Sequence, residues 1–332
     1  MKNIILFGLS FLSSSLYAAS VTVSGISSGG YMAQQFHTAF SSEVSGVGIV
    51  AAGPYYCAKG SMIDALNKCM KTPMGMPRVE TSLEEAKKVA KMNLIDPLDN
   101  IKNSKVFIVS GIHDHTVVQE VAELNVDVYK AWGVKEENLR TDFKIPVGHA
   151  FPTDNYGNRC ETESKSPWIS NCDRDMAGEI LEHLLGSLKM KTEGKDSRLF
   201  SFQQLKDHAG KEYDRLSMHA KGYVYIPEGC DSSRRTSCPV HIAFHGCQQT
   251  LDDIGEIFVK NTGYNDWAES NKIIVLYPQA RRAQMMSNPN GCWDWWGYSG
   301  DNYHTKKGLQ MKVVYSLLKA VQSGRLVLDK EL

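Results

Sequence analysis

A serine flanked by glycines lies near the start of the chain, in the pentapeptide Gly25-Ile26-Ser27-Ser28-Gly29. It matches G-x-S-x-G, a pattern that places a nucleophilic serine on a strained turn between a strand and a helix. The alternation of residues 21–26 predicts the strand, and the helical spacing of residues 31–40 predicts the helix. A glycine-rich hairpin turn is the alternative, but this context favours Ser27 as a nucleophile.

A serine hydroxyl attacks well only when a histidine accepts its proton and a carboxylate orients that histidine. In the fold that uses this turn, the acid and then the base follow the serine along the chain, each in a loop after a strand. Asp114 follows the apolar run 105–110, and His149 follows the strand-like run 143–148. The sequence therefore predicts a catalytic triad of Ser27, Asp114 and His149.

Other interpretations of the same residues stay open. The side chains of His113, Asp114 and His115 alternate along an extended segment, so that two of them could reach one metal ion. No second cluster of histidines or acidic residues lies nearby, which disfavours a metal site. His149 could instead be a structural histidine, although its Gly-His-Ala-Phe loop stands where a base is expected. We expect neither a metal nor a cofactor.

Two backbone N–H groups are needed to stabilise the negative charge that develops on the substrate oxygen. One should belong to Ser28, directly after the nucleophile, and the other usually comes from a His-Gly loop earlier in the chain. Here the His-Gly signal lies at residues 244–247, more than 200 residues after Ser27. The order of the elements is therefore rotated, which indicates a circular permutation of the fold.

Short apolar runs and helical spacings alternate along the chain, which predicts an α/β fold: a mostly parallel central sheet flanked by helices. Predicted strands lie at 21–26, 46–52, 105–110, 222–226, 240–244 and 272–277, and predicted helices at 31–40, 119–132, 176–190 and 307–322. Neither half is a complete unit. We therefore expect one catalytic α/β-hydrolase domain at 20–332, with the triad in 20–190 and the oxyanion-loop strands and substrate loop in 200–332.

Composition and cysteines indicate an exported protein. Residues 1–19 have a basic tip, a short apolar stretch and small residues at the end, as a signal peptide does. No later segment is apolar enough to span a membrane, and 37 basic residues balance 37 acidic ones, which argues against nucleic-acid binding. Six of the eight cysteines form pairs 8 to 12 positions apart, as small disulfide loops would. We expect a secreted or periplasmic protein.

Three of the six tryptophans lie in one short segment, as Trp293, Trp295 and Trp296. Aromatic faces exposed in a loop can hold an apolar ester chain. The alternative is that these rings fill the core or brace a neighbouring disulfide. We expect the segment to serve both purposes.

Several segments together resemble a known family: VSGISSGGYMA, GIHDHTV, VGHAFPTD, HIAFHGCQQT and GCWDWWGYSG. In this order they are similar to the single-domain, circularly permuted polyhydroxybutyrate depolymerases, over nearly the whole chain after residue 19. The resemblance implies a secreted serine esterase that hydrolyses poly(3-hydroxybutyrate) or its oligomers. We expect a monomer whose partner is this polyester or oligoester substrate.

The resemblance also implies roles for individual residues. It makes Ser27 the nucleophile, Asp114 the acid and His149 the base. It assigns the oxyanion hole to the N–H groups of Ser28 and Cys247 and places Trp293, Trp295 and Trp296 at the substrate. The implied disulfides are Cys57–Cys69, Cys160–Cys172, Cys230–Cys238 and Cys247–Cys292.

Two other functions fit the same residues. An esterase of acetylated or feruloylated polysaccharides is the alternative enzyme, because one fold and triad serve many esters. A secreted binding protein on an inactive hydrolase scaffold is the alternative of another class, and the intact set of Ser, Asp and His disfavours it.

Overall fold

The computed structural model describes residues 20–206, 216–231, 237–283 and 288–329. The predicted signal peptide, residues 1–19, lies outside the described residues. Strands are β1 (Val21–Ile26), β2 (Val44–Val50), β3 (Lys105–Val109), β4 (Leu139–Asp142), β5 (Phe151–Thr153), β6 (Asn158–Arg159), β7 (Ile169–Asn171), β8 (Leu199–Gln203), β9 (Lys221–Tyr225), β10 (Val240–Phe244) and β11 (Ile274–Tyr277). Helices are α1 (Ser28–Ala39), α2 (Met62–Asp64), α3 (Val79–Lys91), α4 (Gln119–Ala131), α5 (Met176–Leu185), α7 (Leu251–Ile254), α8 (Ile257–Asn261), α9 (Tyr264–Asn271) and α10 (Leu309–Gln322).

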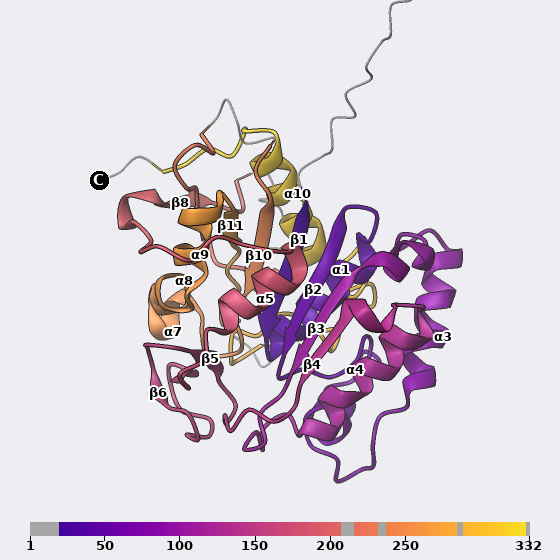
Figure 1. The fold of residues 1–332 in the computed structure, drawn as a ribbon. Coiled ribbons are helices and arrows are strands. Elements are labelled where there is room, and N and C mark those ends of the chain that lie inside the picture. The colour runs from indigo at the N-terminus through magenta and orange to yellow at the C-terminus, as the bar shows by residue number, and fades with distance from the viewer. Residues whose placement is uncertain (1–19, 207–215, 232–236, 284–287, 330–332) are drawn as a thin grey trace, which may run out of the picture.

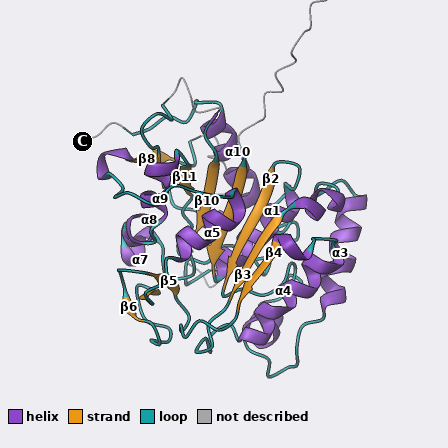
Figure 2. Cartoon of the chain, in the orientation of Figure 1, coloured by secondary structure: helices purple, strands orange, loops and turns teal. Residues whose placement is uncertain are grey.

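The central sheet joins strands from both halves of the chain (Figures 1 and 2). Its order is β4-β3-β2-β1-β10-β11-β9-β8, so that β1 lies between β2 and β10 and is parallel to both. Only the pairs of β11 with β9 and of β9 with β8 are antiparallel. The predicted α/β architecture with a mostly parallel sheet is therefore confirmed. Since β10 and β11 continue the sheet on one side of β1, the C-terminal half of the chain forms that side of the framework around Ser27.

Alternation along the central strands divides the core into two layers. On β3, Val106 and Ile108 belong to one cluster of buried side chains, while Phe107 and Val109 belong to the other. The first cluster includes buried side chains of α1, α3, α4 and α10, and the second includes those of α5, α8 and α9. Helices thus cover both faces, as a buried parallel sheet requires. In the part of the chain that the structure describes, no helix has the length and hydrophobicity needed to cross a membrane.

Several predicted boundaries differ from the structure for local reasons. Helix α1 begins at Ser28, earlier than the predicted 31–40, because Ser-Gly-Gly opens the helix although it is typical of a turn. Helix α5 ends at Leu185, before the predicted residue 190, because the following Gly186 has a φ of 95° that terminates the helix. The strand of this region is β4, so the predicted strand-like run 143–148 is wrong as a strand. Its backbone instead hydrogen-bonds to the loop of Asp114.

Four disulfides join the eight cysteines, in the four pairings that the resemblance implied. They are Cys57–Cys69, Cys160–Cys172, Cys230–Cys238 and Cys247–Cys292. Disulfides of this number are typical of proteins that fold in an oxidising compartment.

Candidate active site

Ser27 occupies the sharp turn between β1 and α1. Its φ of 56° and ψ of −124° lie in a region that residues other than glycine rarely adopt. The surrounding backbone holds it there: the Ser27 N–H donates to the carbonyl of Val50 at 2.9 Å, and helix α1 begins at the next residue. The structure therefore has the strained strand-to-helix turn that G-x-S-x-G predicts, with the serine at its tip.

The glycines around Ser27 are required by close backbone contacts. A Cβ atom on Gly25 would lie 2.2 Å from the carbonyl oxygen of Gly29. A Cβ on Gly29 would lie 2.4 Å from the carbonyl oxygens of both Phe244 and His245. Since neither distance is possible for real atoms, any larger residue would push α1 away from β1 or β10.

Asp114 and His149 form a buried hydrogen-bonded pair. Asp114 Oδ2 lies 2.8 Å from His149 Nδ1, and the Asp114 side chain is fully buried. Oδ1 of the same carboxylate accepts the backbone N–H groups of Thr116 and Val117 at 3.0 and 2.9 Å. The acid is thus fixed by its own loop and leaves one oxygen for the histidine. This is the geometry that orients an imidazole whose Nε2 can act as a base.

A second carboxylate, Glu163, supports the same histidine. Its Oε2 accepts the backbone N–H of His149 at 2.9 Å, and its Oε1 accepts the hydroxyl of Thr116 at 2.7 Å. Burial lowers the pKa of His149, but the charges of Asp114 and Glu163 and the hydrogen bond to Asp114 more than offset this, so that the pKa is raised. Nothing in the sequence around Glu163 marks it as functional, because its partners come from two other loops.

We predict that Glu163→Gln shifts the acid limb of the pH profile of kcat/KM to lower pH. The base must be neutral, and Glu163 raises the pKa of His149, so removing its charge lets His149 lose its proton at lower pH. The isosteric amide can still accept the His149 N–H, so the plateau rate should fall by less than about tenfold. Initial rates measured from pH 4 to 9 test this. An acid limb that stays in place or moves upward contradicts it.

The loop after β10 lies against the nucleophile. A Cβ on Gly246 would be 3.3 Å from the Cβ of Ser27, although the two residues are far apart in sequence. Ser28 is the first residue of α1, and the first N–H groups of a helix have no acceptor within it. The two segments predicted to supply the oxyanion hole, at Ser28 and at the loop of Gly246 and Cys247, thus both lie next to Ser27.

A cavity of about 270 Å³ opens beside Ser27 and His149. Gly246 and Cys247 of the loop after β10 line it, and so do the polar side chains of Thr116, Ser164, Gln248, Gln249, Asn288 and Asn290. Its apolar lining comes from several elements and comprises Ile26, Met62, Ala65, Leu66, Met70, Trp168, Trp295 and Trp296. Such an apolar wall binds chains with few charged groups.

The tryptophan segment differs in part from the prediction. Trp295 and Trp296 line the cavity, but Trp293 is fully buried and packs against Phe244 and His245, at ring distances of 5.1 and 5.5 Å. The prediction that Trp293 contacts substrate is therefore not supported, because the ring packs in the core against the end of β10 and does not line the cavity. Even Trp295 is largely covered, since it stacks on Tyr31 at 4.1 Å.

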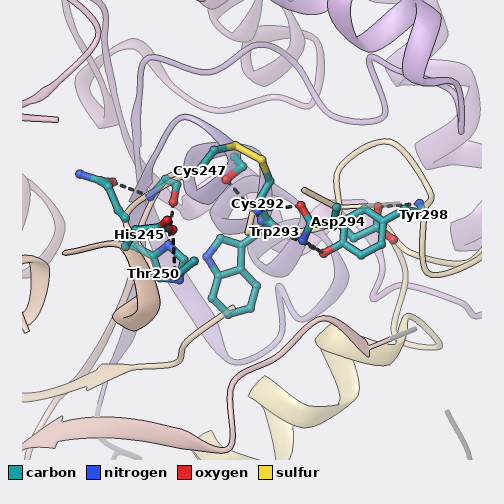
Figure 3. The surroundings of a disulfide bond; sticks show 12 residues. His245, Cys247, Thr250, Cys292, Trp293, Asp294 and Tyr298 are labelled. Carbon is teal, nitrogen blue, oxygen red and sulfur yellow. Dashed lines mark hydrogen bonds between the residues drawn. A yellow bond between two sulfur atoms is a disulfide. The ribbon is translucent and has the colours of Figure 1, made fainter. Parts of the chain in front are cut away.

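Asp294 gives the tryptophan segment its shape. Its buried carboxylate accepts the N–H groups of Gly297, Tyr298 and Ser299 at 2.7, 3.1 and 2.8 Å. The segment is thus a compact turn around one carboxylate, with Cys292 at its start bonded to Cys247 (Figure 3).

The metal alternative at residues 113–115 has little geometric support. The Asp114 carboxylate is already bound to His149 and to two backbone N–H groups. Within the described ranges, no three His, Cys, Asp or Glu side chains come together as a metal site would need.

The disulfide Cys247–Cys292 joins the loop beside Ser27 to the tryptophan segment. We predict that the double variant Cys247→Ser/Cys292→Ser loses stability and activity together. Its loop of 45 residues corresponds to roughly 4 kcal/mol of unfolding free energy in the chain-entropy model. Urea unfolding and ester hydrolysis measured on the same samples test this.

Removing Cys230–Cys238 provides the matched control. Its loop spans 8 residues, which corresponds to roughly 2.5 kcal/mol in the same model. Neither cysteine lines the cavity. This variant should lose stability and keep its activity under conditions where it is folded. Equal losses of activity in the two double variants would contradict a specific role of Cys247–Cys292 at the site.

Comparisons with known proteins agree with one another. No protein-family model matches the chain. The chain is 38% identical over 304 residues to a poly(3-hydroxybutyrate) depolymerase of Delftia acidovorans, which covers 91% of the chain and 60% of the relative. The chain thus spans only part of that relative's length. It is 37% identical to a polyhydroxybutyrate depolymerase of Talaromyces funiculosus, over 92% of the chain and 90% of the relative.

Solved structures have the same fold. The crystal structure of a PHB depolymerase from Penicillium funiculosum superposes with a TM-score of 0.82 at 35% identity, covering 92% of this chain and 96% of that one. A second structure, with the same score and coverage, is a PHB depolymerase variant in complex with an R3HB trimer.

Proposed function

This chain belongs to the polyhydroxybutyrate depolymerase family, and on that premise we propose that it hydrolyses the ester bonds of poly(3-hydroxybutyrate) or its oligomers. The observation that carries the proposal is the hydrogen bond of 2.8 Å between Asp114 and His149 beside a cavity that Ser27 also lines. The R3HB trimer bound by a related structure supports an oligoester as the ligand of this cavity.

The proposed reaction proceeds in two steps through an acyl-enzyme. His149 Nε2 takes the proton of Ser27 as its Oγ attacks the ester carbonyl, and Asp114 stabilises the imidazolium that forms. The N–H groups of Ser28 and Cys247 stabilise the oxyanion. The tetrahedral intermediate expels the alcohol, which takes the proton from His149. Water then attacks the acyl-enzyme by the same route and releases the acid.

We also propose a location and an assembly state for the protein. Four disulfides favour an oxidising compartment, and the sequence of residues 1–19 favours export to the periplasm or the medium. We further propose that residues 20–332 form one permuted catalytic domain that acts as a monomer, without nucleic-acid partners. The position of β10 next to β1, with β11 next to β10, supports the permuted order.

Product analysis tests the substrate. Wild-type protein is incubated with the trimer of (R)-3-hydroxybutyrate, with amorphous poly(3-hydroxybutyrate) and with acetylated xylan. We expect hydroxybutyrate monomers and dimers from the first two and no acetate release from the third. Acetate release with intact hydroxybutyrate esters would contradict the proposal and favour a carbohydrate esterase. Absence of all hydrolysis would favour a binding protein.

A further inference from the structure

Three hydrogen-bonded side chains, Thr116, Glu163 and Ser164, form a hydroxyl wall on the side of the cavity where His149 lies. Thr116 Oγ1 and Ser164 Oγ each lie 2.7 Å from Glu163 Oε1, and they lie 2.5 Å from each other. Thr116 and Ser164 line the cavity, whereas Glu163 does not and uses its other oxygen to accept the His149 N–H. The proposed mechanism gives none of the three a role in bond breaking.

The hydroxyl wall presents only hydrogen-bond acceptors to the cavity. Burial raises the pKa of Glu163, but the hydrogen bonds from Ser164, Thr116 and the His149 N–H more than offset this, so that the pKa is lowered and the group is ionised at neutral pH. Each hydroxyl has one proton and the carboxylate has none. Both protons are used within the wall, whichever hydroxyl donates to the other. Lone pairs and a negative charge therefore face the substrate.

No cationic side chain in the cavity lining compensates this charge. Among the described residues that line the cavity, none is Lys or Arg, and His149 is the one group that titrates. Asp114 and Glu163 both bond to His149, so the net charge of these three groups is negative whether the imidazole is neutral or protonated. The titratable residues next to the wall in sequence are exposed or half-buried and lie outside the lining: His113, His115, Glu161 and Lys165.

The leaving half of the substrate begins on the same side of the cavity. The alcohol that the reaction expels takes its proton from His149 Nε2, so the chain attached to that oxygen must begin next to His149. In an oligomer of 3-hydroxybutyrate, this half carries the free carboxyl end. When the last ester bond is cleaved, only the short carbon backbone of one hydroxybutyrate unit separates the carboxylate from the alcohol oxygen. That carboxylate then meets acceptors and a like charge.

We propose that Glu163 is a specificity-determining residue: its charge behind Thr116 and Ser164 disfavours a free carboxylate on the leaving side of the cavity. This inference rests on the proposed ester hydrolysis and adds a selection among ester bonds. The last bond before a free carboxyl end is cleaved poorly, and a neutral group in the same position is accepted. Oligoesters are consequently cleaved at the bonds farther from their carboxyl end.

The dimer of (R)-3-hydroxybutyrate, supplied as the free acid and as the primary amide, tests the proposal. The two compounds have nearly the same shape and differ in the charge at the carboxyl end. We expect kcat/KM of the wild type at neutral pH to be about three- to tenfold higher for the amide, as repulsion between partly solvated charges gives. An amide that is cleaved no faster than the acid overturns the proposal. If p-nitrophenyl butyrate and the hydroxybutyrate trimer are not hydrolysed either, the proposed function itself has failed.

Glu163→Gln removes the charge and keeps an oxygen that can accept from the two hydroxyls. The ratio of kcat/KM for the amide to that for the acid should fall to within about twofold of one. This ratio cancels the change in the pKa of His149, because both substrates use the same base. Glu161→Gln is the matched control, since Glu161 lies in the same loop, is exposed and pairs with Arg159 at 4.0 Å. It should keep the wild-type ratio, and an unchanged ratio in Glu163→Gln contradicts the proposal.

The pH dependence of the same ratio in the wild type keeps the inference testable if Glu163→Gln does not fold. Toward about pH 4, near the ordinary pKa of a carboxyl group, the free acid of the dimer becomes neutral like the amide. Protonation of the substrate removes the repulsion, so the ratio should fall toward one as the pH is lowered. A ratio that stays constant or rises over this range would show that charge does not cause the selection, and the proposal would be wrong.

Discussion

Replacing Ser27 with alanine is expected to lower kcat for ester hydrolysis by about 10⁴-fold or more while the protein keeps its fold. The hydroxyl is the only group removed, and its proposed role is the attack on the ester carbonyl. The strained turn depends on the backbone contacts of residue 27 and on the flanking glycines, which the substitution leaves in place. Hydrolysis of p-nitrophenyl butyrate and of the hydroxybutyrate trimer, with thermal unfolding followed by circular dichroism, tests this.

Ser28→Ala is the control for this prediction. Only the backbone N–H of Ser28 is proposed to act on substrate, and the Ser28 hydroxyl oxygen accepts the backbone N–H of Trp293 at 3.3 Å. Loss of that hydrogen bond should cost about 1 kcal/mol of stability and leave kcat within about tenfold. An inactive Ser28→Ala beside an active Ser27→Ala would mean that the nucleophile has been assigned to the wrong serine.

Asp114→Asn is expected to lower kcat by about 10⁴-fold with little change in structure. Oδ1 accepts two backbone N–H groups, from Thr116 and Val117, so the amide oxygen of the asparagine must stay in that position. The NH₂ group then faces His149 Nδ1, where the carboxylate stood. Since this group donates, Nδ1 must accept, and the ring proton moves to Nε2. In that tautomer His149 cannot take the proton of Ser27.

The matched control is Asp142→Asn, which removes a carboxylate at the end of β4 that bonds to Arg174 and is not part of the cavity lining. It should leave kcat within about twofold and lower stability by about 1 kcal/mol or less, as is usual for a partly exposed ion pair. Steady-state kinetics and urea unfolding of both variants decide the matter. A loss below tenfold for Asp114→Asn would show that His149 does not depend on this acid.

The sequence determined the features that depend on neighbours along the chain. The turn at Ser27 is local, because Gly25 is needed for the close approach of its backbone to that of Gly29, four residues later. Strands β1, β3 and β10 are located within a residue, because alternation along residues 21–26 and short, mostly apolar runs at the other two strands are local patterns. The order of strands and loops along the chain identified Ser27, Asp114 and His149. In the structure Ser27 and His149 line one cavity, and His149 is hydrogen-bonded to Asp114. Their catalytic roles remain predictions.

Only the tertiary structure decided which distant residues meet. Gly246 lies against Ser27, Glu163 accepts the N–H of His149, and Trp293 lies behind β10 and not in the cavity. Each contact joins segments that are separate in sequence, so neither periodicity nor residue type records it. Such contacts form only when the whole sheet has assembled with β1 between β2 and β10. The assembled sheet then sets the position of each loop.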